Sequence, residues 1–392
     1  MGLFKRKPTG MPDKFKNENG IILSKNYAME TDTQKKGVHN NNVVVIGQSG
    51  VGKTRAFVIP NILQKNANYI INDKNGEIYD QTANELEAAG YNIVKVTIDE
   101  IPEYLYIFNE TTKVEDVESY IKTIYKNSEK TDAYWGKLEQ DLCSAIVWCF
   151  LLQNKNTAWG FKKMLDMLNM FYEQQDEKTT KLDIFMEKIA EMNPGEAGSE
   201  LTKLYEPFKR LHSSNKKLVV DALKTKLTPF FTKKAPQTID LTKDKTAVYV
   251  TYGENEPNTA LLLSVFYLYI TKTLYAKEAP FTEIILDQFN DIGEIDAMAR
   301  RTTQALRNNV SIIVTTESLT ALAPNYEQDY LIDSFDTIVF MGSYNTKTME
   351  FIRQTAELFT QRYWDIKDIQ KLTPNQVLIL MSRTGVYADG KR

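Results

Sequence analysis

The chain has 392 residues, 42% of them hydrophobic, which is enough for one large core or for two to three domains of ordinary size. Its formal net charge of −3 at pH 7 excludes a uniformly basic nucleic-acid-binding protein, so any DNA contact must come from basic residues gathered locally. The two cysteines and two histidines lack metal-ligand spacing, which excludes a zinc site and a disulfide framework.

The beginning of the chain is polar and rich in Lys, Asn, Thr and Gly. We expect residues 1–41 to form a tail with at most a short strand at 20–23. The basic start is not followed by an apolar stretch, so no secretory signal is predicted. No run approaches the roughly 18 consecutive apolar residues of a membrane span. We therefore expect a soluble chain on the cytosolic side.

Short apolar strands alternate with helices from residue 42 onward, which is typical of a parallel sheet covered on both faces. The first strands are expected at 43–46, 69–72 and 92–97, and the helices between them at 54–64 and 77–89. Strand patterns return later, at 247–252, 283–286, 310–316, 337–341 and 377–381. We predict an α/β fold with a mostly parallel central sheet.

The segment between these two groups of strands has a different character. Apolar residues recur there at helical spacing, as at Leu138, Leu142, Ile146 and Phe150. We predict an all-α domain at 114–235 that interrupts the sheet. The α/β domain then consists of a first part at 42–113 and a second part at 236–392.

A phosphate-binding pattern, G-x-x-x-x-G-K-[S/T], directly follows the first predicted strand. A strand, a glycine-rich turn and a helix in this order place backbone N–H groups and a helix N-terminus around a phosphate. We expect Lys53 to reach the β- and γ-phosphates and Thr54 to offer its hydroxyl to Mg²⁺. The residues predicted to bind nucleotide are Gly47, Gln48, Ser49, Gly50, Val51, Gly52, Lys53, Thr54 and Arg55. The sequence therefore predicts ATP and Mg²⁺ as ligands.

Two later strands end in polar residues at the same edge of the predicted sheet. Asp287 follows the strand at 283–286, where a carboxylate completes the magnesium site. In hydrolysing P-loop proteins the next residue is usually a Glu that polarises water, but here it is Gln288, and an amide cannot accept a proton. Glu317 follows the strand at 310–316, at the position that normally senses the γ-phosphate.

Three segments together make the resemblance specific: GQSGVGKTRAFVIPNIL, INDKNGEIYDQTANELEAAGYNIVKV and LDQFNDIGEIDAMARRTTQALRNNVSIIVTTESLTAL. With the helical insertion, they resemble the TraG-like family of type IV coupling proteins from about Gly37 to the end of the chain. Members are RecA-like or FtsK-like ATPases that recruit relaxase-bound DNA to a conjugation or type IV secretion channel.

The resemblance implies a P-loop motor that hydrolyses ATP in a hexameric ring. It implies a cytoplasmic location at the inner face of the cell membrane. The implied partners are DNA, in single-stranded form with its relaxase, relaxosome accessory proteins, the ATPase of the secretion channel and a separate membrane anchor protein. Arg307 matches an arginine that reaches the neighbouring subunit's γ-phosphate, whereas Arg300 and Arg301 are expected to face a ring pore or solvent.

The chain departs from the family pattern at three places. The lysine of the family's D-P-K-G-E is displaced by one position in the segment 73–77, Gln288 replaces Glu, and Glu317 replaces Gln. One interpretation is that acid and amide have exchanged places, so that Glu317 activates water and Gln288 senses phosphate. A second is that Gln288 is a Glu→Gln change introduced to trap bound ATP. A third is that the protein binds nucleotide without turning it over.

The family's two N-terminal transmembrane helices are not predicted in this sequence. We therefore expect either a truncated chain or a member that docks on a separate membrane protein. Two other functions stay open: a nucleotide-binding scaffold of the channel without turnover, and a channel-assembly ATPase that does not act on DNA.

Overall fold

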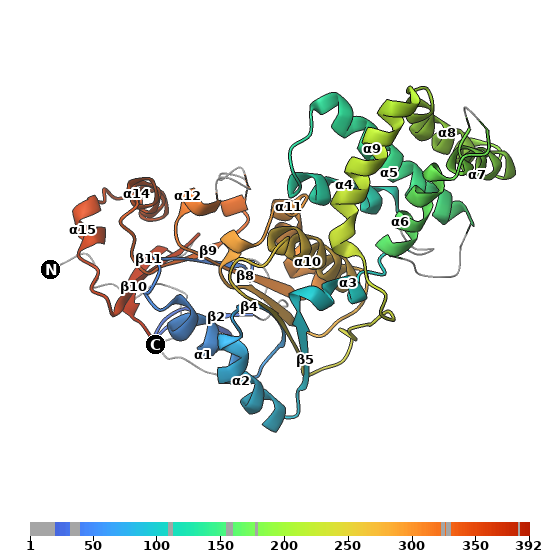
Figure 1. Ribbon diagram of the computed structural model, residues 1–392. Coiled ribbons are helices and arrows are strands. Elements are labelled where there is room, and N and C mark those ends of the chain that lie inside the picture. The colour runs from blue at the N-terminus through green and yellow to red at the C-terminus, as the bar shows by residue number, and fades with distance from the viewer. Residues whose placement is uncertain are drawn as a thin grey trace.

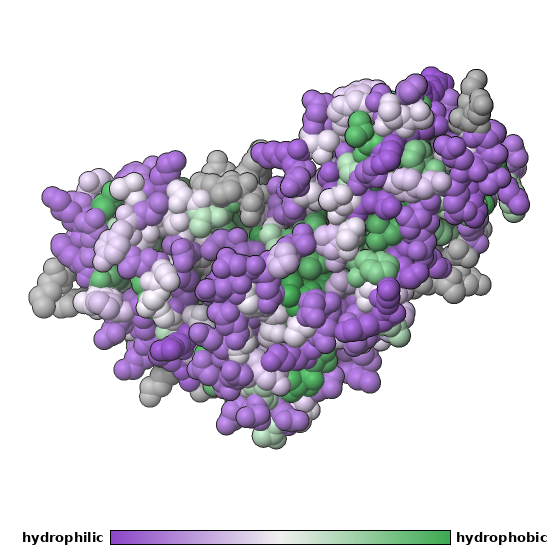
Figure 2. Space-filling model, in the orientation of Figure 1, coloured by the Kyte–Doolittle hydropathy of each residue, from purple (hydrophilic) through white to green (hydrophobic). Residues whose placement is uncertain are grey.

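The structure is a computed structural model. It describes residues 20–31, 40–108, 113–153, 160–176, 179–322, 326, 331–382 and 385–392. Figure 1 shows an α/β part built on a large sheet and a group of helices, α4 to α9, at one end of it. The visible face of both parts is largely hydrophilic, with apolar residues in small scattered groups (Figure 2).

The described residues of the α/β part form a nine-stranded sheet in the order β11-β10-β9-β3-β8-β7-β4-β6-β5. Its strands are β3 Val43–Ile46, β4 Asn68–Lys74, β5 Asn92–Thr97, β6 Thr246–Tyr252, β7 Thr282–Leu286, β8 Val310–Thr316, β9 Thr337–Phe340, β10 Gln376–Met381 and β11 Gly385–Gly390. The pairs from β9 to β5 are parallel, and β10 is antiparallel to both β9 and β11. The predicted α/β fold with a mostly parallel sheet is confirmed.

Alternate residues of each strand pack on opposite faces of the sheet, as the period of two requires. In β3, Val44 and Ile46 belong to the core under α10, whereas Val43 and Val45 belong to the core under α1 and α2. The helices of this part are α1 Ile59–Ile62, α2 Glu77–Ala88, α3 Ile101–Tyr104, α10 Thr259–Tyr275, α11 Met298–Gln304, α12 Leu319–Leu322, α14 Thr346–Thr360 and α15 Ile366–Gln370. Both faces are thus covered, which explains why the strands are apolar throughout.

The helical part lies between β5 and β6 in the chain. Its helices are α4 Val114–Lys126, α5 Ala133–Gln153, α6 Phe161–Asn169, α7 Lys181–Met192, α8 Glu196–Lys209 and α9 Ser213–Leu227. The long helix α5 contacts all of the others. Two buried ion pairs link α9 to its neighbours, Lys216 with Asp183 at 3.5 Å and Lys226 with Glu139 at 3.0 Å. No helix in the described residues has the length and apolar character to cross a membrane.

Part of the expected polar tail is a folded hairpin, so that expectation is corrected for residues 20–30. Strands β1 Gly20–Ile22 and β2 Ala28–Glu30 pair antiparallel. The side chain of the fully buried Asn61 accepts a hydrogen bond from the N–H of Ile22 at 2.7 Å and donates one to the carbonyl of Ile22 at 3.0 Å. It thus bonds to both backbone groups of Ile22, as a neighbouring strand would. Asp389 of β11 accepts hydrogen bonds from Ser24 and Asn26. The residues before Gly20 lie outside the described part.

One acidic side chain is buried in the sheet without a partner. Glu283 of β7 is 1% exposed, and neither carboxyl oxygen has a hydrogen-bond partner in the described part of the chain. Burial raises the pKa of Glu283 to about 8. In the unfolded chain the same group ionises near about pH 4.3, so the folded protein holds an extra proton between these values. The contribution of Glu283 to the free energy of unfolding therefore falls as pH rises through this window and levels off above it.

We expect Glu283→Gln to remove this dependence, because the amide has a similar shape and does not titrate. The variant should gain about 3–5 kcal/mol of stability relative to the original chain at pH 8, and little at pH 5. Urea unfolding at both pH values measures the gain. A stability difference that is the same at pH 5 and pH 8 would show that Glu283 does not carry the effect.

Candidate functional site

The phosphate-loop segment joins β3 to the helix that follows, at the carboxyl edge of the sheet. Its first two residues are held by backbone hydrogen bonds: Gly47 donates to the carbonyl of Thr316, the last residue of β8, at 3.0 Å, and Gln48 donates to the carbonyl of Gly342, just after β9, at 3.1 Å. Gly50 and Gly52 have φ values of 79° and 90°, a region that favours glycine. The helix begins with a wide π turn at Thr54–Val58. The loop therefore has the curled backbone that phosphate binding needs.

Lys53 lies across its own loop. Its ammonium donates to the carbonyls of Gly47 at 2.5 Å and Gln48 at 3.2 Å. Burial lowers the pKa of Lys53, and the carboxylates of Glu317 and Asp287 oppose that change. The ammonium of Lys53 thus lies against the phosphate loop, and the charges of Glu317 and Asp287 partly offset the effect of burial on its pKa.

The predicted magnesium residues are in direct contact. Thr54 donates its hydroxyl to one carboxylate oxygen of Asp287 at 2.8 Å, and Thr315 donates to the other at 2.5 Å. Asp287 is 4% exposed, and burial raises its pKa. Hydroxyl and carboxylate oxygens are the donors that Mg²⁺ prefers, and a bound cation would offset the cost of ionising a buried acid. The donor set therefore fits Mg²⁺.

Two buried residues that sequence reasoning missed hold Asp287 and its neighbour in place. The hydroxyl of Thr315 accepts the backbone N–H of Gln288 at 3.0 Å. The amide of Asn72, in β4, donates to the backbone carbonyl of Asp287 at 2.6 Å and accepts from Tyr267 of α10 at 3.0 Å. The one available signal was a buried polar residue in a strand, and other polar residues stand in the same two strands, so that signal does not by itself indicate a role.

The displaced-lysine segment 73–77 has a structural explanation. The carboxylate of Asp73 accepts the N–H groups of Ile78 at 3.0 Å and Tyr79 at 2.8 Å, so it caps the start of α2. Burial raises the pKa of Asp73 to about 6. Lys74, the last residue of β4, forms an ion pair with Asp291 at 3.0 Å. This ion pair joins the end of β4 to the segment after β7.

Gln288 and Glu317 both lie at the carboxyl edge, because they follow the adjacent parallel strands β7 and β8. Gln288 is half-buried and adopts a left-handed backbone conformation with φ 53°. Glu317 is exposed, and its charge acts on Lys53. The structure thus brings the amide and the acid to the same edge as the phosphate loop.

Arg307 lies at the opposite edge of the sheet. It belongs to the short helical turn Ala305–Asn308 that precedes β8, and it is exposed. The seven residues of β8 separate it from the carboxyl edge by about 20 Å, at roughly 3.3 Å per residue. Arg307 is therefore too far from the phosphate loop of its own chain to contact a nucleotide there.

Arg300 and Arg301 have different surroundings. Arg300 is exposed, as expected. Arg301 is half-buried, donates to the carbonyl of Asp296 at 3.0 Å and to the hydroxyl of Ser119 at 3.4 Å, and so joins α11 to α4. The expectation that Arg301 faces a pore or solvent is wrong, because its guanidinium has partners inside the fold.

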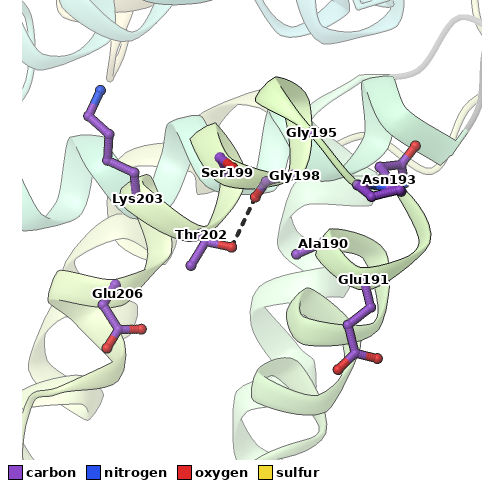
Figure 3. Close-up of a pocket in the computed structure, with 10 residues that line it drawn as sticks. Ala190, Glu191, Asn193, Gly195, Gly198, Ser199, Thr202, Lys203 and Glu206 are labelled. Atoms are coloured by element: carbon purple, nitrogen blue, oxygen red, sulfur yellow. Dashed lines mark hydrogen bonds between the residues drawn. The ribbon is translucent and has the colours of Figure 1, made fainter.

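A surface hollow lies elsewhere in the described part of the chain. It lies in the helical part, where α7 ends and α8 begins, and Figure 3 shows the side chains around it. Glu191 and Glu206 line it, and Thr202 donates to the carbonyl of Gly198 at 2.9 Å. None of the predicted nucleotide-binding residues contributes to this hollow. The candidate site is therefore the open edge around the phosphate loop.

Solved structures with similar folds cover almost the whole chain. The bacterial conjugative coupling protein TrwBΔN70, in complex with sulphate, has a TM-score of 0.68 at 12% identity and covers 100% of this chain and 96% of its own. The plasmid coupling protein TrwB in complex with ADP and Mg²⁺ has a TM-score of 0.65 at 13% identity, with coverage of 97% and 90%. VirB4 of Thermoanaerobacter pseudethanolicus has a TM-score of 0.60 at 14% identity, with coverage of 98% of each chain.

A comparison with curated protein sequences found no match. A comparison with protein-family models matched residues 11–356 to the model described as type IV secretory system conjugative DNA transfer. Because that match takes in most of the 392 residues, the chain belongs to the type IV secretory system conjugative DNA transfer family.

Proposed function

We propose that this protein is an ATP-driven coupling protein that recruits relaxase-bound DNA and helps to move it into a type IV secretion channel. The observation that carries the proposal is the contact of Thr54 with Asp287 beside the glycine-rich loop. Such a loop with a hydroxyl and a carboxylate at one point is the arrangement that holds a nucleoside triphosphate with its metal ion. Family membership supplies the link to DNA transfer.

Residues 47–55 would hold the phosphates with backbone N–H groups, and the ammonium of Lys53 would turn from the loop carbonyls toward them. Thr54 and Asp287 would hold Mg²⁺, which neutralises charge that develops on the phosphates. Attack by water then needs mainly a positioned water molecule and charge stabilisation. Glu317 and Gln288 are the residues available to position that water molecule.

We infer that Glu317 accepts the proton of the attacking water and that Gln288 orients the terminal phosphate. The inference is supported by the charge of Glu317, which opposes the lowering of the pKa of Lys53 by burial. Lys53 is the residue expected to contact the γ-phosphate. An acid at the end of the strand next to β7 has access to the same phosphate as an acid at position 288. There are two rival interpretations. In one, Gln288 is a Glu→Gln change that traps bound ATP. In the other, the protein binds nucleotide without turning it over.

The motor would act as a homo-oligomer, with six subunits in a ring. Arg307 is compatible with this arrangement, because it lies at the amino edge of the sheet, away from the phosphate loop of its own chain. Relaxase, relaxosome accessory proteins, the channel ATPase and a separate membrane anchor would be its partners at the inner face of the cell membrane. A nucleotide-binding scaffold of the channel is the second candidate, favoured by the amide at Gln288.

We expect the chain as written to hydrolyse ATP and to do so faster with single-stranded DNA. Glu317→Gln should lower kcat by at least about 100-fold, because it removes the proton acceptor. Assays of ATP turnover with and without DNA measure the stimulation by DNA and the loss in Glu317→Gln, with Gln288→Glu assayed in parallel.

If only Gln288→Glu turns over ATP, Glu317 has no catalytic role and position 288 is a blocked site. Nucleotide-dependent assembly without turnover would favour the scaffold.

Thr315→Val should weaken the binding of MgATP by about tenfold, because it leaves one oxygen of Asp287 and the N–H of Gln288 without a partner. Thr315→Ser keeps the hydroxyl and should bind like the original chain. Calorimetric titration with and without Mg²⁺ checks the effect, which should be lost when the metal is omitted. Equal affinities for the Val and Ser variants would contradict this role for the hydroxyl.

Arg307→Ala and Lys53→Ala should each abolish most turnover, whereas a mixture of the two should recover part of it. In a mixed ring some interfaces combine an intact phosphate loop with an intact Arg307 from the next subunit. A mixture of Lys53→Ala with Glu317→Gln is the control, because both changes damage the same side of each site. Recovery in neither mixture would argue against action between subunits.

A further inference from the structure

The residues proposed to bind the metal ion and to activate water lie on one side of the phosphate loop only. Asp287 and Glu317 directly follow β7 and β8, which lie on one side of β3. The terminal phosphate must point toward them. The nucleoside, at the other end of the phosphate chain, must then extend toward β9, β10 and β11.

That second side carries a lysine in contact with the loop. In β11, Gly390 pairs with Gln376 at the carboxyl edge, and Lys391 follows it. The ammonium of Lys391 donates to the carbonyl of Val51, inside the phosphate loop, at 2.8 Å. Among the described residues it makes no ion pair, so two of its three N–H donors are available for an anion.

The same side carries an exposed aromatic ring. The loop after β9 is tied to the phosphate loop through Gly342, whose carbonyl accepts the N–H of Gln48. Two residues further on, Tyr344 is 89% exposed. The amide of the next residue, Asn345, is used inside the fold: it accepts from the N–H of Thr348 at 2.9 Å and donates to Thr320 at 3.0 Å. The group that this loop presents outward is therefore the ring of Tyr344.

We propose that Tyr344 and Lys391 form the nucleoside side of the site, where the ring stacks on a purine base and the ammonium binds an α-phosphate oxygen. The inference rests on the proposed function, since it places the remainder of the same nucleotide. A stacked base is held by its face, and both purines offer a similar face. The protein should therefore bind MgATP and MgGTP with affinities within a factor of about three.

Calorimetric titration with MgATP and with magnesium tripolyphosphate separates the two residues. Tyr344→Ala should weaken the binding of MgATP by about tenfold and leave the affinity for tripolyphosphate unchanged, because tripolyphosphate has no base. Lys391→Ala should weaken both ligands by about three- to tenfold. Tyr344→Phe keeps the ring and should bind like the original chain. Tyr363→Ala is the matched control, since Tyr363 is 78% exposed and lies beyond the far end of α14.

Equal MgATP affinities for Tyr344→Ala and the original chain, with binding still lost in Lys53→Ala, would overturn the inference and leave the proposed function intact. A loss of tripolyphosphate binding in Tyr344→Ala would also overturn it, because the ring would then affect the loop and not the base. If the original chain binds neither ligand, the proposed function fails and the inference falls with it.

Discussion

The carboxyl edge of the sheet, around the phosphate loop, depends on one buried carboxylate. Asp287 would be costly to ionise in the interior, and the two threonine hydroxyls that bond its oxygens offset part of that cost. Each hydroxyl comes from a different neighbour, Thr54 from the phosphate loop and Thr315 from β8. The acid therefore sets the spacing between the loop and the strand that bears Glu317. Lys53 and Gln288 are positioned by the same arrangement.

Contacts continue from this edge to the helical part. Asn72 connects the backbone of Asp287 to Tyr267 of α10, and α10 packs against α4. The end of α4 also holds the segment after β7, because the side chain of Asn127 exchanges hydrogen bonds with the backbone of Glu294 at 2.7 and 2.8 Å. The segment that follows Gln288 thus begins beside Thr315 and the phosphate loop and ends against the first helix of the insertion. This gives a contiguous set of contacts between the two parts.

Sequence patterns predicted the strands from β3 to β10, the helical insertion and the phosphate loop, because apolar periodicity and the glycine pattern are local properties. They did not predict β2 or β11. The six residues of β11 include two glycines and Asp389, a composition unfavourable to strands, and pairing with β10 decides its conformation. Thr315, Asn72 and Lys391 were missed because their partners, Asp287 and Val51, lie far away in the chain. Arg301 was misplaced since sequence gives no sign that Ser119 lies beside it.

The sheet order also has a consequence for association between molecules. Its two edges are β5 and β11, and an open edge invites pairing with another chain. In β5 the edge carries Lys95, which lies over the ring of Tyr79, and in β11 the backbone carbonyl of Gly390 is already bonded to Lys25 of the β1–β2 hairpin. A charge and a covering hairpin are known protections against edge-to-edge aggregation. Both edges of the sheet are therefore protected against extension into the sheet of another molecule.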